Sequence, residues 1–116
     1  SFKETQALLT SNVLVTCITK DGLTKLAGTD DHQGVVAHTT VFVVQKKCFD
    51  PKKNPCIVLI DGVQDTRNLG GILRSVHCTG ANGVVIPEKN NASLTGATFK
   101  ASAGLAEHLA VWQPST

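Results

Sequence analysis

The stretch CIVLIDGVQDTRNLGGILRSVHCTGANGVVI, residues 56–86, decides the fold. It opens at 57–60 with four apolar residues, three of them β-branched, which is the composition of a buried strand. An Asp-Gly pair at 61–62 ends this run, a helix is predicted over 68–78, and the apolar residues 84–86 form a second strand. Two apolar strands joined by a helix indicate a βαβ unit in a parallel sheet.

The predicted helix has an apolar face and a polar side. Its apolar residues follow the i, i+3, i+4, i+7 spacing and are expected to be buried: Leu69, Ile72, Leu73 and Val76. Polar residues of this helix and of the loop before it lie beyond the carboxyl end of a strand, where parallel sheets bind ligands. These residues are Asp65, Arg67, Asn68 and Arg74.

Residue type alone leaves the roles of these polar side chains open. Arg67 and Arg74 are seven residues apart and share a helix face, so both could contact phosphate or remain solvated. A surface ion pair is a further alternative for Arg74. Asn68 is of a type that caps helix N-termini well.

The rest of the pattern predicts an α/β domain with a mainly parallel sheet flanked by helices. The sheet is expected to include Ile57–Ile60, Val84–Ile86 and Leu109–Val111. The other predicted elements are a short helix at Ser1–Leu9, a strand at Val13–Ile18, a helix at Lys20–Ala27 with Leu23 and Leu26 inward, extended segments at Val35–Val36 and Val41–Val44, one of them an edge strand, and a helix at Leu94–Ser102.

Length and charge narrow the function classes. The 116 residues fit one small domain, and the formal net charge of +2 is not the strongly basic balance of many nucleic-acid-binding domains. Four lysines nonetheless flank one loop, either as a patch for RNA phosphates or as ordinary solvated residues: Lys46, Lys47, Lys52 and Lys53. No run has the length of a membrane span and no signal peptide precedes the first predicted strand, so no membrane association is expected.

The four cysteines lack the C-x-x-C spacing of a zinc site, and no metal is expected. Cys17 and Cys56 lie in apolar runs and are predicted to be buried thiols. Without a disulfide framework, a reducing compartment is favoured, and the predicted localisation is the cytoplasm.

The segment Asp65–Ser75, with the pattern D-x-x-N-L-G-x-I-x-R-S, resembles the first signature motif of the SpoU-type (TrmH-like) RNA 2'-O-ribose methyltransferases of the SPOUT superfamily. The family usually has proline and alanine where this chain has Thr66 and Gly71. Two more segments are similar to the family in the same order. Asp31–Ala37 resembles its H-Q-G linker segment, and Lys100–Glu107 resembles its K-x-S-x-G-A-x-E segment.

The resemblance implies a division of the chain. Residues 1–33 are expected to be the last part of an RNA-binding domain resembling ribosomal protein L30e, with its linker, and residues 34–116 the N-terminal half of the methyltransferase domain. The family's two later motifs, which form a trefoil knot around S-adenosylmethionine, do not occur in the sequence. The chain is therefore expected to lack the segment that binds the methyl donor, to form homo-oligomers and to transfer no methyl group alone.

The resemblance also implies an activity and a set of site residues. The expected activity of the whole protein is 2'-O-methylation of ribose in rRNA or tRNA by a homodimer, with S-adenosylmethionine as donor. Arg74 is implied as the base, and Asn68 as the residue that orients the ribose or pairs with a glutamate of a later motif. Arg67, Arg74 and the four lysines are the expected RNA contacts.

Two other classes of protein are alternatives to an RNA methyltransferase. A dinucleotide-binding Rossmann unit needs G-x-G-x-x-G after the first strand, which the Asn-Leu-Gly-Gly sequence at 68–71 does not supply. A non-catalytic RNA-binding module derived from a methyltransferase stays open as the alternative. Calorimetry with S-adenosylmethionine would separate such a module from an enzyme.

Overall fold

The computed structural model describes residues 12–115, which form two compact units divided between Thr40 and Val41. The described part of the first unit contains one helix, α2 (Lys20–Ala27). Thr19 caps it by accepting a hydrogen bond at Oγ1 from the Gly22 N–H (3.2 Å), and Gly28 ends it in the left-handed conformation at φ 66°. No described residue of this unit is buried, so α2 is held by local hydrogen bonds rather than by a core.

Three predictions for the first unit are wrong. Residues 13–18 are exposed and form no strand, because no described strand lies beside them to pair with their backbone. Leu26 is 56% exposed instead of inward, and Leu23 is only half-buried. Cys17 is exposed, since the run that contains it is not packed against anything described. The helix predicted at 1–9 lies outside the described residues.

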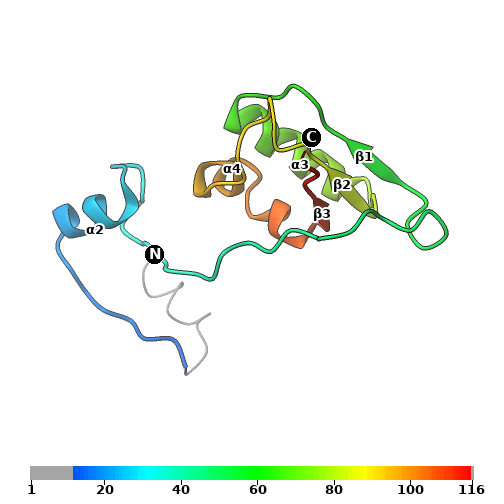
Figure 1. Cartoon of the computed structure of the whole chain (residues 1–116). Coiled ribbons are helices and arrows are strands. Elements are labelled where there is room, and N and C mark those ends of the chain that lie inside the picture. Colours follow the sequence, from blue (N-terminus) through cyan, green and yellow to red (C-terminus); the bar gives the residue numbers. More distant parts are fainter. Residues whose placement is uncertain (1–11, 116) are drawn as a thin grey trace. The chain divides into compact units, whose positions relative to one another are not determined.

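The second unit is built on a parallel sheet of three strands, β1 (Ile57–Leu59), β2 (Gly83–Val85) and β3 (Val111–Trp112), in the order β1-β2-β3 (Figure 1). The predicted parallel sheet is confirmed, with the last strand beginning two residues later than predicted. Beside β3, Gln45 makes a single parallel bridge with Trp112. The edge strand expected at 35–36 or 41–44 is therefore reduced to one bridge at the following residue.

The strands are joined by α3 (Thr66–Cys78) between β1 and β2, and by α4 (Gly96–Ala101) and the 3-10 helix η1 (Leu105–His108) between β2 and β3. Because α3 packs against both α4 and η1, these helices cover the same face of the sheet. The largest fully buried apolar side chains belong to one core cluster formed by α3 and the strand segments: Leu69, Leu73, Val84, Ile86 and Val111. The α/β architecture is confirmed. Of the helices in residues 12–115, none has the length and apolar character needed to cross a bilayer.

Two glycines mark places where backbones meet closely. A Cβ atom on Gly70 of α3 would lie 2.5 Å from the Cβ of Ala101 and 2.6 Å from the Thr98 carbonyl oxygen, so α4 packs directly on the backbone of α3. A Cβ atom on Gly83 of β2 would lie 2.4 Å from the Phe49 ring. Phe49 is buried and belongs to the loop that carries the four lysines, so this contact fixes that loop against the sheet.

β1 is less buried than its apolar sequence predicts. Leu59 is 67% exposed, and Ile57 and Val58 are half-buried. Because β1 lies at the edge of the described sheet and only one of its faces meets α3, side chains on its other face reach solvent. Cys56, just before the strand, is exposed instead of buried; its N–H donates to Asn82 Oδ1 (3.0 Å).

Candidate functional site

The loop after β1 and the first turn of α3 form the candidate site. Asp65 caps the helix, since its Oδ1 accepts a hydrogen bond from the Asn68 N–H (2.8 Å) and its carbonyl accepts one from the Leu69 N–H (2.9 Å). α3 therefore begins at Thr66, two residues earlier than predicted. Asn68 lies inside the first turn and is not the N-cap, which leaves its side-chain amide available to a ligand.

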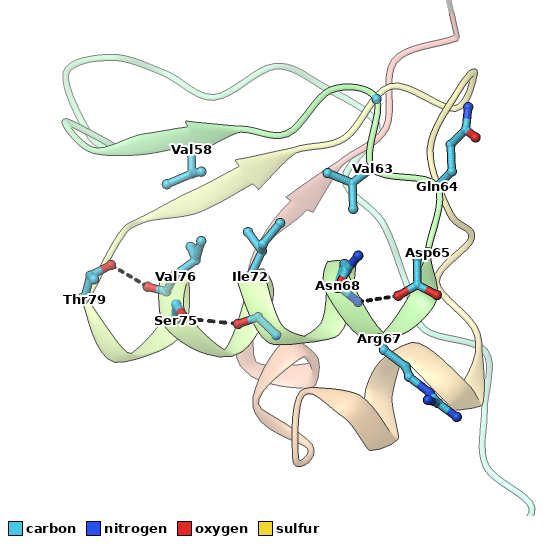
Figure 2. A pocket seen from close by; sticks show the side chains of 12 residues that line it. Val58, Val63, Gln64, Asp65, Arg67, Asn68, Ile72, Ser75, Val76 and Thr79 are labelled. Atoms are coloured by element: carbon cyan, nitrogen blue, oxygen red, sulfur yellow. Dashed lines mark hydrogen bonds between the residues drawn. The ribbon is translucent and has the colours of Figure 1, made fainter.

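A cavity of about 920 Å³ lies between β1 and α3. Figure 2 shows Val58 of β1 and Val63 of the following loop on one side, with Ile72 and Val76 of α3 facing them. Ile72 was predicted to be buried with the core, but it is half-buried because it lines this cavity. The wall near the sheet is thus apolar, and the polar lining comes from the loop and from α3.

Only part of the polar lining is free to bind a ligand. The Ser75 hydroxyl donates to the Gly71 carbonyl (3.1 Å), and the Thr79 hydroxyl donates to the Val76 carbonyl (2.8 Å). By contrast, the side chains of Gln64, Arg67 and Asn68 have no hydrogen-bond or ion-pair partner among residues 12–115. These amide and guanidinium groups can donate to a polyanionic or sugar-containing ligand.

The other predicted site residues lie elsewhere. Arg74 is exposed on α3 but does not line the cavity, and the seven-residue spacing places it about 10 Å from Arg67 along the helix axis. The four lysines, also exposed, belong to the loop that enters β1 at its amino end, whereas Asn68 follows its carboxyl end. The structure therefore brings Arg67 and Asn68 together, but not Arg74 or the lysines.

Residues 55–116, more than half of the chain, match the family model described as the SpoU rRNA Methylase family. The chain belongs to the SpoU rRNA methylase family. Two bacterial relatives carry the name "Putative TrmH family tRNA/rRNA methyltransferase". The one from Staphylococcus saprophyticus is 37% identical over an alignment of 97 residues, and the match covers 75% of this chain and 38% of the relative. The one from Staphylococcus aureus is 35% identical over an alignment of 107 residues, and the match covers 85% of this chain and 42% of the relative.

The fold is also found among solved structures. The crystal structure of an RNA 2'-O ribose methyltransferase superposes with a TM-score of 0.51 and 24% sequence identity, over 61% of this chain and 27% of the other. The α/β fold of part of a SpoU-type protein is thereby confirmed. The domain division at residues 33 and 34 stays a prediction.

Three polar cavity residues, in or beside the SpoU motif, had not been predicted as site residues: Gln64, Ser75 and Thr79. Gln64 could have been found from its place directly after a strand. Ser75 and Thr79 lie seven and eleven residues after Asn68. That spacing places all three on one helix face, and could have identified them.

No group of three or more His, Cys, Asp or Glu side chains that could hold a metal occurs in residues 12–115. A sulfonium donor is positively charged and would be stabilised by a carboxylate. Among the described lining residues the only carboxylate is Asp65, whose Oδ1 accepts the capping hydrogen bond of α3.

Proposed function

We propose that the protein acts in the 2'-O-methylation of ribose in tRNA or rRNA with S-adenosylmethionine as donor, and that these 116 residues bind the RNA without transferring a methyl group alone. Membership of the SpoU family supports the reaction class. The observation that carries the proposal is the position of the SpoU motif. Arg67 and Asn68 offer side chains with no partner in residues 12–115, just beyond the carboxyl end of β1.

Each of these side chains has a proposed role in the reaction. The ribose hydroxyl must lose its proton as its oxygen attacks the methyl carbon and the sulfur–carbon bond breaks, and positioning contributes much of the acceleration. Asn68 is proposed to orient the ribose, and Arg67 to hold a phosphate. Arg74 is proposed as the base, although arginine is almost always protonated. That role requires further groups around this exposed side chain, which the proposed homodimer would supply.

A non-catalytic RNA-binding module is the alternative for these 116 residues. It is favoured by the position of Arg74, the proposed base, which is exposed and does not line the cavity. Calorimetry with S-adenosylmethionine and incubation with labelled donor and RNA separate the two functions. Donor binding with methyl incorporation that Arg74→Ala removes would establish catalysis by this chain.

RNA binding itself is tested by salt dependence. The logarithm of the affinity for single-stranded RNA falls linearly with the logarithm of salt concentration, by a slope of about 0.7 per phosphate contact. Arg67→Ala and Arg74→Ala should each lower this slope by about 0.7, measured by fluorescence anisotropy. Lys100→Ala, which removes an exposed lysine of α4 outside the cavity and the lysine loop, is the control and should leave it unchanged. Unchanged slopes for both arginine variants would contradict the proposed contacts.

The proposed location of the protein is supported by its thiols. All four cysteines are free and exposed, which supports a reducing compartment, and we place the protein in the cytoplasm.

A further inference from the structure

Asn91 lies in the loop between β2 and α4, outside the SpoU motif, and contacts the loop that follows β1. Its Oδ1 atom accepts a hydrogen bond from the N–H of Val63, 28 residues away, at 3.0 Å. In the opposite direction, the Ala92 N–H donates to the Val63 carbonyl at 2.7 Å. Both backbone polar groups of Val63 are therefore held by two consecutive residues of the other loop.

The amide nitrogen of Asn91 is held equally well. Nδ2 donates to the Pro87 carbonyl at 3.0 Å and to the Lys89 carbonyl at 3.1 Å. Only one orientation of the amide satisfies all three contacts, because the Val63 N–H needs an acceptor and the two carbonyls need donors. The side chain thus acts as a bracket that fixes its own loop and the loop after β1 together.

Val63 connects this bracket to the candidate site. Its side chain lines the cavity, as Figure 2 shows, and it precedes by two residues the Asp65 that caps α3. Any displacement of Val63 is passed through this short loop to Asp65 and to the first turn of α3. That turn carries Arg67 and Asn68, which have no described partners of their own to hold their side chains.

We propose that Asn91 is a positioning residue, which fixes the loop at 61–65 so that Asn68 meets the ribose of a bound RNA. This inference rests on the proposed function. Phosphate contacts depend mainly on charge, whereas a contact to the 2'-hydroxyl, the group that distinguishes RNA from DNA, depends on geometry. Asn91 should therefore set the preference for RNA over DNA and leave the number of phosphate contacts unchanged.

Asn91→Asp is the most informative variant because it preserves shape and changes only hydrogen bonding. Ionised, the carboxylate still accepts from the Val63 N–H but faces the carbonyls of Pro87 and Lys89 without a proton to donate. Protonated, it donates to one of them. Folding therefore disfavours the ionised form and raises the pKa of this carboxyl above its unfolded value. A hydrogen bond to the Pro87 or Lys89 carbonyl is accordingly regained as pH falls through the folded pKa.

Hydrogen exchange of the Val63 amide tests the bracket. In ionised Asn91→Asp, repulsion between the carboxylate and the Pro87 and Lys89 carbonyls should push the side chain away from Val63. The protection of the Val63 amide, corrected for the intrinsic rate, should therefore be about tenfold or more below wild type at neutral pH and should recover in acid. Asn90→Asp is the matched control. It adds the same charge one residue away, at φ 60°, where Asp is tolerated, and follows Glu88 and Lys89 in the same loop. The control should keep wild-type protection and show no recovery in acid.

The same three proteins are then compared in binding to a single-stranded RNA and to the DNA of identical sequence. Asn91→Asp should lower the ratio of RNA affinity to DNA affinity about threefold or more. Its slope of log affinity against log salt concentration should equal that of the Asn90→Asp control. Unchanged Val63 protection would overturn the bracket. Lost protection with an unchanged RNA preference would overturn the positioning role. If the wild-type protein bound no RNA, both the proposed function and the proposed ribose contact would be wrong. The exchange rate of the Val63 amide would still show whether Asn91 holds the loop.

Discussion

Within residues 12–115, the two units contain similar apolar runs and helix caps, but only in the second unit do these elements pack against one another. The apolar run at 13–18 resembles the run at 57–60, yet the first is exposed and the second forms β1, paired with β2. Likewise, α2 and α3 both have a side-chain N-cap, but α2 buries no residue. α3 buries Leu69, Gly70, Leu73 and Val76. Apolar periodicity therefore predicts what an element is able to pack, and burial additionally requires a partner.

The largest expected difference between the units is in their apolar contacts. Leu73→Ala in α3 should lower the free energy of unfolding by about 2–5 kcal/mol, because it leaves a cavity in the core. Leu26→Ala in α2 should change it by less than about 0.5 kcal/mol, since that side chain is mostly exposed. Urea unfolding followed by the fluorescence of Trp112 in β3 and by circular dichroism measures both. Equal losses would show that the units are equally packed.

A smaller effect is expected from two adjacent glycines of α3. Gly70→Ala should cost about 1–3 kcal/mol or more, because the new Cβ would collide with Ala101 and with the Thr98 carbonyl of α4. Gly71→Ala should instead stabilise the helix by about 0.5–1 kcal/mol, since nothing lies within 4 Å of its Cβ position and alanine favours helix. Thermal unfolding of the two variants gives the comparison. A stable Gly70→Ala protein would mean that α4 does not pack as described.

The helix caps should give the smallest effect. Asp65→Ala and Thr19→Ala each remove one capping acceptor, at a local cost of about 1 kcal/mol. Only Asp65→Ala should lower the stability reported by Trp112, because α3 is part of the core and α2 has none. For Thr19→Ala the loss should appear as faster amide exchange within α2. A shift of the Trp112 transition by Thr19→Ala would show that the two units unfold together.

Most of the second unit follows from the sequence because its signals are local. The strands, α3 and the face bearing Leu69 and Leu73 follow from apolar periodicity, and the parallel arrangement follows from the strand–helix–strand order. Helix boundaries were less predictable, since Asp65 and Asn68 are both good caps and only the structure shows which one accepts the hydrogen bond. The exposure of Leu59 depends on what lies beside β1, which local sequence does not contain.

The candidate site was predictable to the same limited extent. Arg67 and Asn68 were located by the rule that ligands bind beyond strand ends, and that rule applied equally to Gln64. Helical spacing correctly put Arg67 and Arg74 on one side of α3 but did not reveal that the cavity opens beside only one of them. Asn91 had no local signal, because its partner Val63 is 28 residues away.

The strand order β1-β2-β3 has a consequence for how the chain assembles. Each strand pairs with the one synthesised just before it, so the sheet can be extended strand by strand as the polypeptide emerges, without any strand being inserted between two others. Gln45 is the exception, since its bridge partner is Trp112, at the opposite end of the second unit. Closing that long loop carries the largest entropic cost, and it is expected to come last among the pairings of the described sheet.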